Sequence, residues 1–76
     1  MQYDDGQEIL IGDEVDLDGD LAIVETVFDT PERLKAYGMP TDGPGVLFEC
    51  KRTGAVFEPR AGISWNAIRL LRRWSL

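Results

Sequence analysis

The sequence predicts a small, mainly β protein: one antiparallel barrel of five or six short strands, with one short helical segment near residues 30–37. Eight glycines and four prolines divide the 76 residues into pieces that are mostly too short for a full helix. The pieces between them are rich in β-branched and aromatic residues. A closed barrel would also protect the edges that a small open sheet exposes.

The chain has the length of a single domain, spanning residues 1–76. Apolar residues make up 43% of it, which favours a compact fold over disorder. At this size a lone hydrophobic core is only marginally stabilising.

Three strands are expected in the first half of the chain. Glu8–Ile11 is a short one, and Glu14–Leu17 alternates apolar with acidic residues, as half-buried strands do. An Asp18-Gly19 turn, favoured because both residues tolerate positive φ, leads into the strand Leu21–Phe28. The side chains expected to point inward are Val15, Leu17, Leu21 and Ile23.

The segment after the third strand favours a short helix. Thr30 can cap it, Pro31 suits its first position and Gly38 ends it. Beyond the loop MPTDGPG, the strands Gly45–Cys50 and Ala55–Glu58 are expected, joined through Thr53-Gly54.

The C-terminal run 63–76 fits two patterns. Ile68, Leu70, Trp74 and Leu76 alternate as in a strand, whereas Ile63, Ala67, Leu70, Leu71 and Trp74 would share one face of a helix. We expect a turn at Ser64–Asn66 followed by a closing strand over about 67–73, with the helix as the alternative.

The stretch EVDLDGDLAIVE, residues 14–25, has the acid and glycine spacing of a calcium-binding EF-hand loop. An EF-hand needs a helix on each side of the loop. Gly6 and Gly12 interrupt the preceding segment, and β-branched residues dominate the following one. We therefore expect a hairpin and no metal site, with weak cation binding by Asp16, Asp18 and Asp20 as the alternative.

Charge is distributed unevenly along the chain, which carries a formal net charge of −6. Residues 1–32 contain eleven acids and no Lys or Arg, whereas residues 33–76 contain three acids and eight basic residues. Part of this asymmetry can be internal pairing. One interpretation is an ordinary solvated surface of mixed sign; the other is an acidic face that would steer a basic partner and repel nucleic acid or anionic membranes.

Enzyme chemistry finds little support in the residue types present. There is no histidine, Cys50 is the only cysteine, and no glycine loop has the spacing that cradles phosphate. We expect neither catalysis nor a cofactor, and Cys50 fits a small buried core residue. The lone cysteine, the lack of a basic and apolar leader in MQYDDGQE and the absence of a membrane-length apolar run predict a cytoplasmic protein without membrane contact.

Two resemblances extend this interpretation. The stretch GDEVDLDGDLAIVETVF is similar to the opening hairpin of KOW-type and other SH3-like barrels, which implies that fold and, for the KOW type, nucleic-acid or ribosome association. The motifs DG, IGDEV and GVLFE together resemble small bacterial immunity proteins found beside polymorphic toxins, which look like cytosolic SH3-like barrels.

We therefore predict a non-enzymatic protein-binding module, in its most concrete form an immunity-like protein that neutralises a basic toxin domain. Its candidate contact residues are Asp16, Asp18, Asp20 and Glu25. The alternative is a KOW-like nucleic-acid or ribosome-associated module that uses Arg69, Arg72 and Arg73 with Trp65 and Trp74. A third possibility is a subunit of a larger assembly, and the sequence leaves self-association open.

Overall fold

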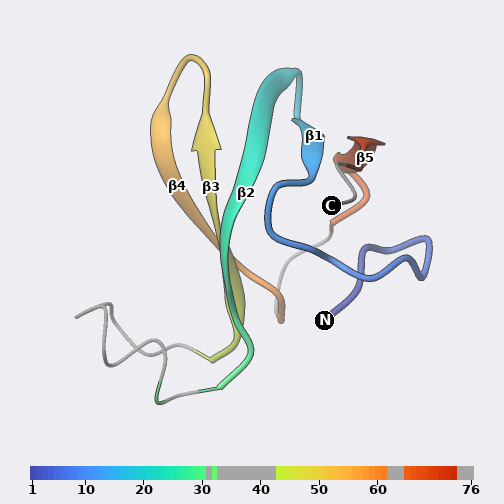
Figure 1. Ribbon diagram of the computed structural model, residues 1–76, viewed down its shortest axis with the longest axis vertical. Helices are drawn as coiled ribbons and strands as arrows, with labels where there is room; N and C mark the ends of the chain where they lie inside the picture. Colours follow the sequence, from blue (N-terminus) through green and yellow to red (C-terminus); the bar gives the residue numbers. More distant parts are fainter. Residues whose placement is uncertain (31, 33–42, 62–64, 74–76) are drawn as a thin grey trace.

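Five strands form one antiparallel sheet in the order β4-β3-β2-β1-β5 (Figure 1). The computed structural model describes residues 1–30, 32, 43–61 and 65–73. The strands are β1 (Glu14–Leu17), β2 (Asp20–Phe28), β3 (Gly45–Cys50), β4 (Gly54–Pro59) and β5 (Ile68–Arg72). The prediction of a mainly β antiparallel fold is confirmed.

The sheet is not closed. β5 pairs with β1 at one edge and β4 pairs with β3 at the other, and among the described residues no ladder joins β4 to β5. The closed barrel is therefore not confirmed. The connection between these two edge strands instead contributes Trp65, whose side chain is fully buried in the core.

The Asp18-Gly19 turn joins β1 and β2 as predicted. Both residues have positive φ, 50° and 89°, and the Asp16 carboxylate accepts a hydrogen bond from the Gly19 N–H at 2.9 Å. Positive φ at both central positions is the geometry that matches the twist of a two-residue hairpin.

The side-chain phase predicted for β2 is wrong. The turn sets Leu17 opposite Asp20, so Val15 faces Ala22 and shares the core side of the sheet with it. Leu21 and Ile23 consequently point outward and are 41% and 46% exposed. A register that differs by one residue reverses every side chain, because the period of a strand is two.

A β-bulge at Glu25 divides β2 into two parts of opposite phase. Before it, Val24 pairs with Phe48 on the core side; after it, Val27 pairs with Val46 on that side. Phe28 therefore lies on the other side of the sheet from Val24 and Val27, where it is fully buried and meets Phe57 edge-on at 6.1 Å between ring centroids.

The core lies on one side of the sheet and centres on Trp65. Its indole contacts the rings of Phe48 and Tyr3, with centroids 5.9 Å and 6.5 Å away, and donates a hydrogen bond to the Pro59 carbonyl at 3.1 Å. The other buried members are Ile9, Val15, Ala22, Val24, Val46, Cys50 and Ile68. The expectation that Cys50 is a core residue is confirmed.

Two local predictions, the strand Glu8–Ile11 and the Thr53-Gly54 connection, need correction. Glu8–Ile11 forms no strand, only an isolated bridge between Gln2 and Glu8, because its neighbouring turns take the backbone out of the sheet. Three residues, 51–53, connect β3 to β4, and Gly54 at φ 77° already pairs with Cys50.

The C-terminal strand is confirmed as β5 and the helical alternative is wrong, since pairing with β1 supplies the backbone partners that a helix would have made internally. The turn before it includes a hydrogen bond from the Ile68 N–H to the Trp65 carbonyl. The helix expected near residues 30–37 falls almost wholly outside the described residues.

Gly45 is expected to resist substitution by alanine. A Cβ atom there would lie 2.7 Å from the Glu58 carbonyl oxygen and 2.8 Å from Cε2 of Phe57, so β4 would have to shift. We expect Gly45→Ala to lower the free energy of unfolding by about 1–3 kcal/mol, measured by urea denaturation. In a Phe57→Ala background the cost should fall without vanishing, because the carbonyl remains. An equal cost in both backgrounds would contradict this account.

Candidate functional site

The four carboxylates predicted to contact a partner do not form one cluster. Asp16 supports the turn through Gly19, and Asp20 accepts hydrogen bonds from the Arg52 N–H at 3.3 Å and the Thr53 hydroxyl at 3.2 Å. The contacts of Asp20 hold the β1–β2 and β3–β4 turns side by side at one end of the sheet (Figure 1). Asp16 and Asp20 thus have structural contacts within the chain.

The other two predicted carboxylates are more available to a partner. Asp18 is exposed at the tip of the turn, and Glu25 is exposed at the bulge. Within the part of the chain that the structure describes, neither carboxylate has a hydrogen-bond or ion-pair partner.

The arginines of the last strand pair with the acids of the first. Antiparallel register places Arg69 opposite Asp16 and Arg72 opposite Glu14, with ion pairs of 3.3 Å and 3.7 Å. Both arginines are more than half exposed, so each pair stabilises the fold by about 0–1 kcal/mol. The main effect of the pairing is to neutralise the β1–β5 part of the surface.

Apolar side chains lie on the side of the sheet opposite the core, which we call the outer face. Cross-strand partners share a side, and one row runs from Ile23 through Glu49 to Ala55. The next row pairs Leu47 with Phe57, both half-buried. Leu21 lies two residues before Ile23 on the same face. Phe28 also lies on this side, but it is fully buried against Phe57.

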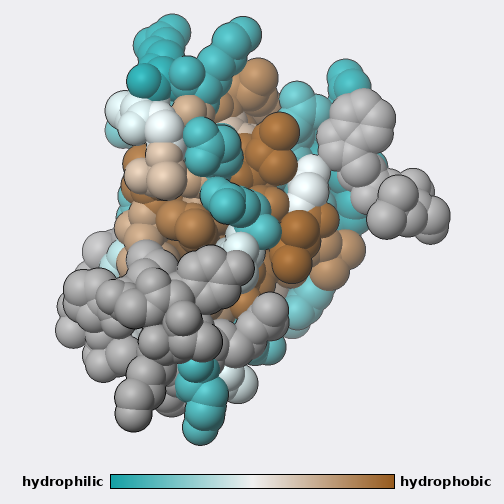
Figure 2. All heavy atoms as spheres, turned by 60° about the vertical axis from the view of Figure 1, so that its left-hand side comes forward, coloured by the Kyte–Doolittle hydropathy of each residue, from teal (hydrophilic) through white to brown (hydrophobic). Residues whose placement is uncertain are grey.

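An open depression of about 430 Å³ lies at the β2–β3 end of the outer face, lined by Leu21, Ala22, Ile23, Glu49, Cys50 and Lys51. Figure 2 brings the β4–β3 side of the molecule toward the viewer and shows hydrophobic surface gathered in its middle, with hydrophilic side chains above. The charged residues that line the depression are the exposed Glu49 and Lys51. Glu25, also exposed, lies two residues after Ile23 at the bulge.

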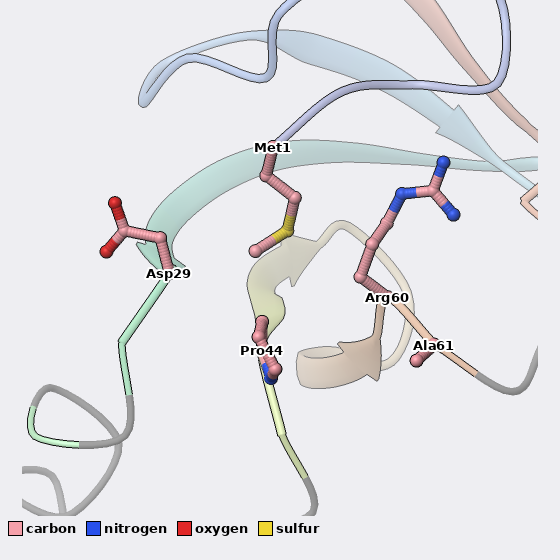
Figure 3. Close-up of a pocket in the computed structure, with 5 residues that line it drawn as sticks. All are labelled: Met1, Asp29, Pro44, Arg60 and Ala61. Carbon is pink, nitrogen blue, oxygen red and sulfur yellow. The ribbon is translucent and has the colours of Figure 1, made fainter.

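A second hollow, of about 380 Å³, is shown in Figure 3. Met1, Pro44 and Ala61 give it an apolar lining, and the charged groups of Asp29 and Arg60 point to opposite sides of it. Arg60 bonds outside the hollow, to the Gln2 carbonyl and the Asp4 carboxylate. No two charged groups among these lining residues converge there to hold a ligand.

Trp65, predicted as an aromatic contact of a nucleic-acid-binding module, is not available to a nucleic acid. Its ring is fully buried and covered by the Arg60 guanidinium, 4.8 Å from the centroid. A buried ring cannot stack on a base. Trp74 lies outside the described residues.

No group of three or more metal-ligating side chains occurs among residues 1–30, 32, 43–61 and 65–73. Among the same described residues, no helix has the length and apolar character to cross a membrane.

Comparison of the chain with family models, curated proteins and solved structures found no match.

Sequence reasoning missed a buried ionic network centred on Asp13, whose side chain is 1% exposed. Its carboxylate accepts hydrogen bonds from the Tyr3 hydroxyl at 2.8 Å, the Leu10 N–H at 3.0 Å and two nitrogens of Arg73 at 3.1 Å. Arg73 also donates to the Glu8 carbonyl. The available signal was the Gly12-Asp13 step before the first strand, but the partners of Asp13 lie up to 60 residues away.

These contacts shift the pKa values of the network. Burial raises the pKa of the Asp13 carboxyl, but hydrogen bonds from Arg73, Leu10 and Tyr3 outweigh it and hold that pKa below its ordinary value. Burial, followed by the hydrogen bond to Asp13, raises the pKa of the Tyr3 hydroxyl well above its usual range. The hydrogen bond to Asp13 also raises the pKa of Arg73. Asp13 and Arg73 are therefore both charged at neutral pH.

The Asp13 network predicts a specific loss of stability in acid. A carboxyl whose pKa is lowered by folding stabilises the protein above its unfolded pKa, and this contribution disappears as the pH falls through the folded pKa. The free energy of unfolding should therefore decline below about pH 4. Asp13→Asn should cost about 1–3 kcal/mol at neutral pH and flatten this decline.

Two variants control for this effect in urea titrations across pH. Tyr3→Phe removes one donor and should cost about 1 kcal/mol while keeping the acid decline. Glu14→Gln breaks an exposed pair and should change stability by less than about 1 kcal/mol. An Asp13→Asn protein with the wild-type pH profile would contradict the assignment.

Proposed function

We propose that this protein is a non-enzymatic protein-binding module for a basic partner, in the manner of an immunity protein that neutralises a toxin. The observation that carries the proposal is that exposed carboxylates lie next to exposed aliphatic side chains on one face of the sheet. The arginines of β5 are paired with acids of the same chain, whereas Glu25 and Glu49 stand exposed beside exposed aliphatic side chains. An acidic and apolar surface favours a partner that is basic and apolar.

The internal ion pairs count against the KOW-like alternative. Phosphate binding depends on an uncompensated positive field, and the net charge of the chain is −6. Arg69, Arg72 and Arg73, the basic residues named for that role, each have a carboxylate partner within the chain.

The proposal predicts capture of a basic protein, and the product of the gene beside its own is the first to test. Co-expression should protect cells from that product, and the purified pair should elute together from a sizing column. Because electrostatic steering is screened by salt, the association rate should fall on the order of tenfold from low to physiological ionic strength.

Separate controls distinguish the alternatives in the same assays. A nucleic-acid mobility shift at low salt with the purified chain should be negative. If the neighbouring product is neither bound nor neutralised, the toxin-neutralising proposal is wrong, and a saturable shift with RNA or DNA would favour the KOW-like module.

A further inference from the structure

On the outer face, two exposed aliphatic side chains are neighbours, whereas on an ordinary hydrated sheet surface such side chains occur singly. Leu21 and Ile23 are adjacent outward positions on the central strand of the sheet, 41% and 46% exposed. Exposed apolar side chains that occur singly need no explanation. These two adjoin a depression of about 430 Å³ and continue toward Leu47 and Phe57 on the neighbouring strands.

The carboxylates on the two sides of Leu21 and Ile23 differ in whether they have a basic partner. Toward β5, the carboxylates of Glu14 and Asp16 are matched by arginines. Toward β3, Glu25 and Glu49 are exposed and, within the described residues, have no ion-pair partner. Lys51 is the basic side chain that lines the depression.

We propose that the outer face of β2, β3 and β4 is the docking surface for a basic segment of the partner, with Leu21 and Ile23 as apolar contacts and Glu25 and Glu49 as carboxylates for its Lys or Arg side chains. This inference rests on the proposed function and gives it a location. The occupant presents aliphatic side chains flanked by basic ones, because that pattern is complementary to both features of the surface.

A second copy of the chain fits this face less well. Two such faces brought together would place the exposed Glu25 and Glu49 carboxylates of both copies in one interface, where Lys51, the basic residue lining the depression, offsets them in part. Like charges juxtaposed in an interface cost several kcal/mol.

The test uses a synthetic peptide that alternates Lys with Leu and Val, titrated into the isotope-labelled chain and followed by amide chemical shifts. A peptide with Glu in place of Lys is the control. We expect saturable shifts at residues 21–25, 47–51 and 55–57 with the basic peptide only. Shifts that map elsewhere, no saturable shifts up to about 1 mM, or equal binding of both peptides would overturn the inference.

Matched variants sharpen the result. Leu21→Ser with Ile23→Ser should weaken peptide binding at least about tenfold, and Leu71→Ser, a single change of the same kind at an exposed position on β5, less than about twofold. Glu49→Lys should weaken it about fivefold, whereas Asp5→Lys, the same charge change on the N-terminal turn, should not. Equal effects of test and control variants would place the site elsewhere.

Two outcomes separate this inference from the proposed function. If the neighbouring gene product binds the wild type and the Leu21→Ser, Ile23→Ser variant equally, the function stands and the location is wrong. A concentration-dependent dimer of the wild type that this variant abolishes would show that a second copy covers the face, and would also overturn the inference.

Discussion

The buried carboxylate of Asp13 is the contact on which the arrangement of the chain ends depends. It joins Tyr3 and Leu10 of the N-terminal segment and Arg73 beyond β5 to the start of β1, so one side chain holds both segments at the β1–β5 edge of the sheet. A buried charge without partners would be strongly destabilising, and each of these donors therefore helps to stabilise the Asp13 carboxylate. In a domain of this size, such a network supplements a small core.

The bulge at Glu25 decides where apolar surface appears on the outside of the molecule. It reverses the phase of β2, so Ala22 and Val24 line the core before it and Phe28 packs with Phe57 on the opposite side after it. Together with the turn register, this arrangement leaves Leu21 and Ile23 on the outer face. The proposed docking surface is thus a consequence of backbone geometry, as bulges often are near functional positions.

Local chemistry explains which parts of the fold could be predicted. The Asp18-Gly19 turn, the Gly45–Cys50 strand and the closing strand follow from residue preferences and alternation over a few neighbours. For the candidate site, the acidic hairpin was predicted and Glu25 lies exposed, as a contact residue must. The role of Asp16 and Asp20 within the fold was not predicted, because their partners come from β5 and from the β3–β4 turn.

The sequence by itself determined the strand composition, the position of the main turn and the imbalance of charge, since each of these depends on residue types and short spacings. Only the tertiary structure decided which apolar residues are buried, which acids are neutralised and that the sheet stays open. The physical reason is that register and long-range pairing determine these properties. A shift of one residue moves Leu21 and Ile23 from one side of the sheet to the other, and the partner of Asp13 lies at the far end of the chain.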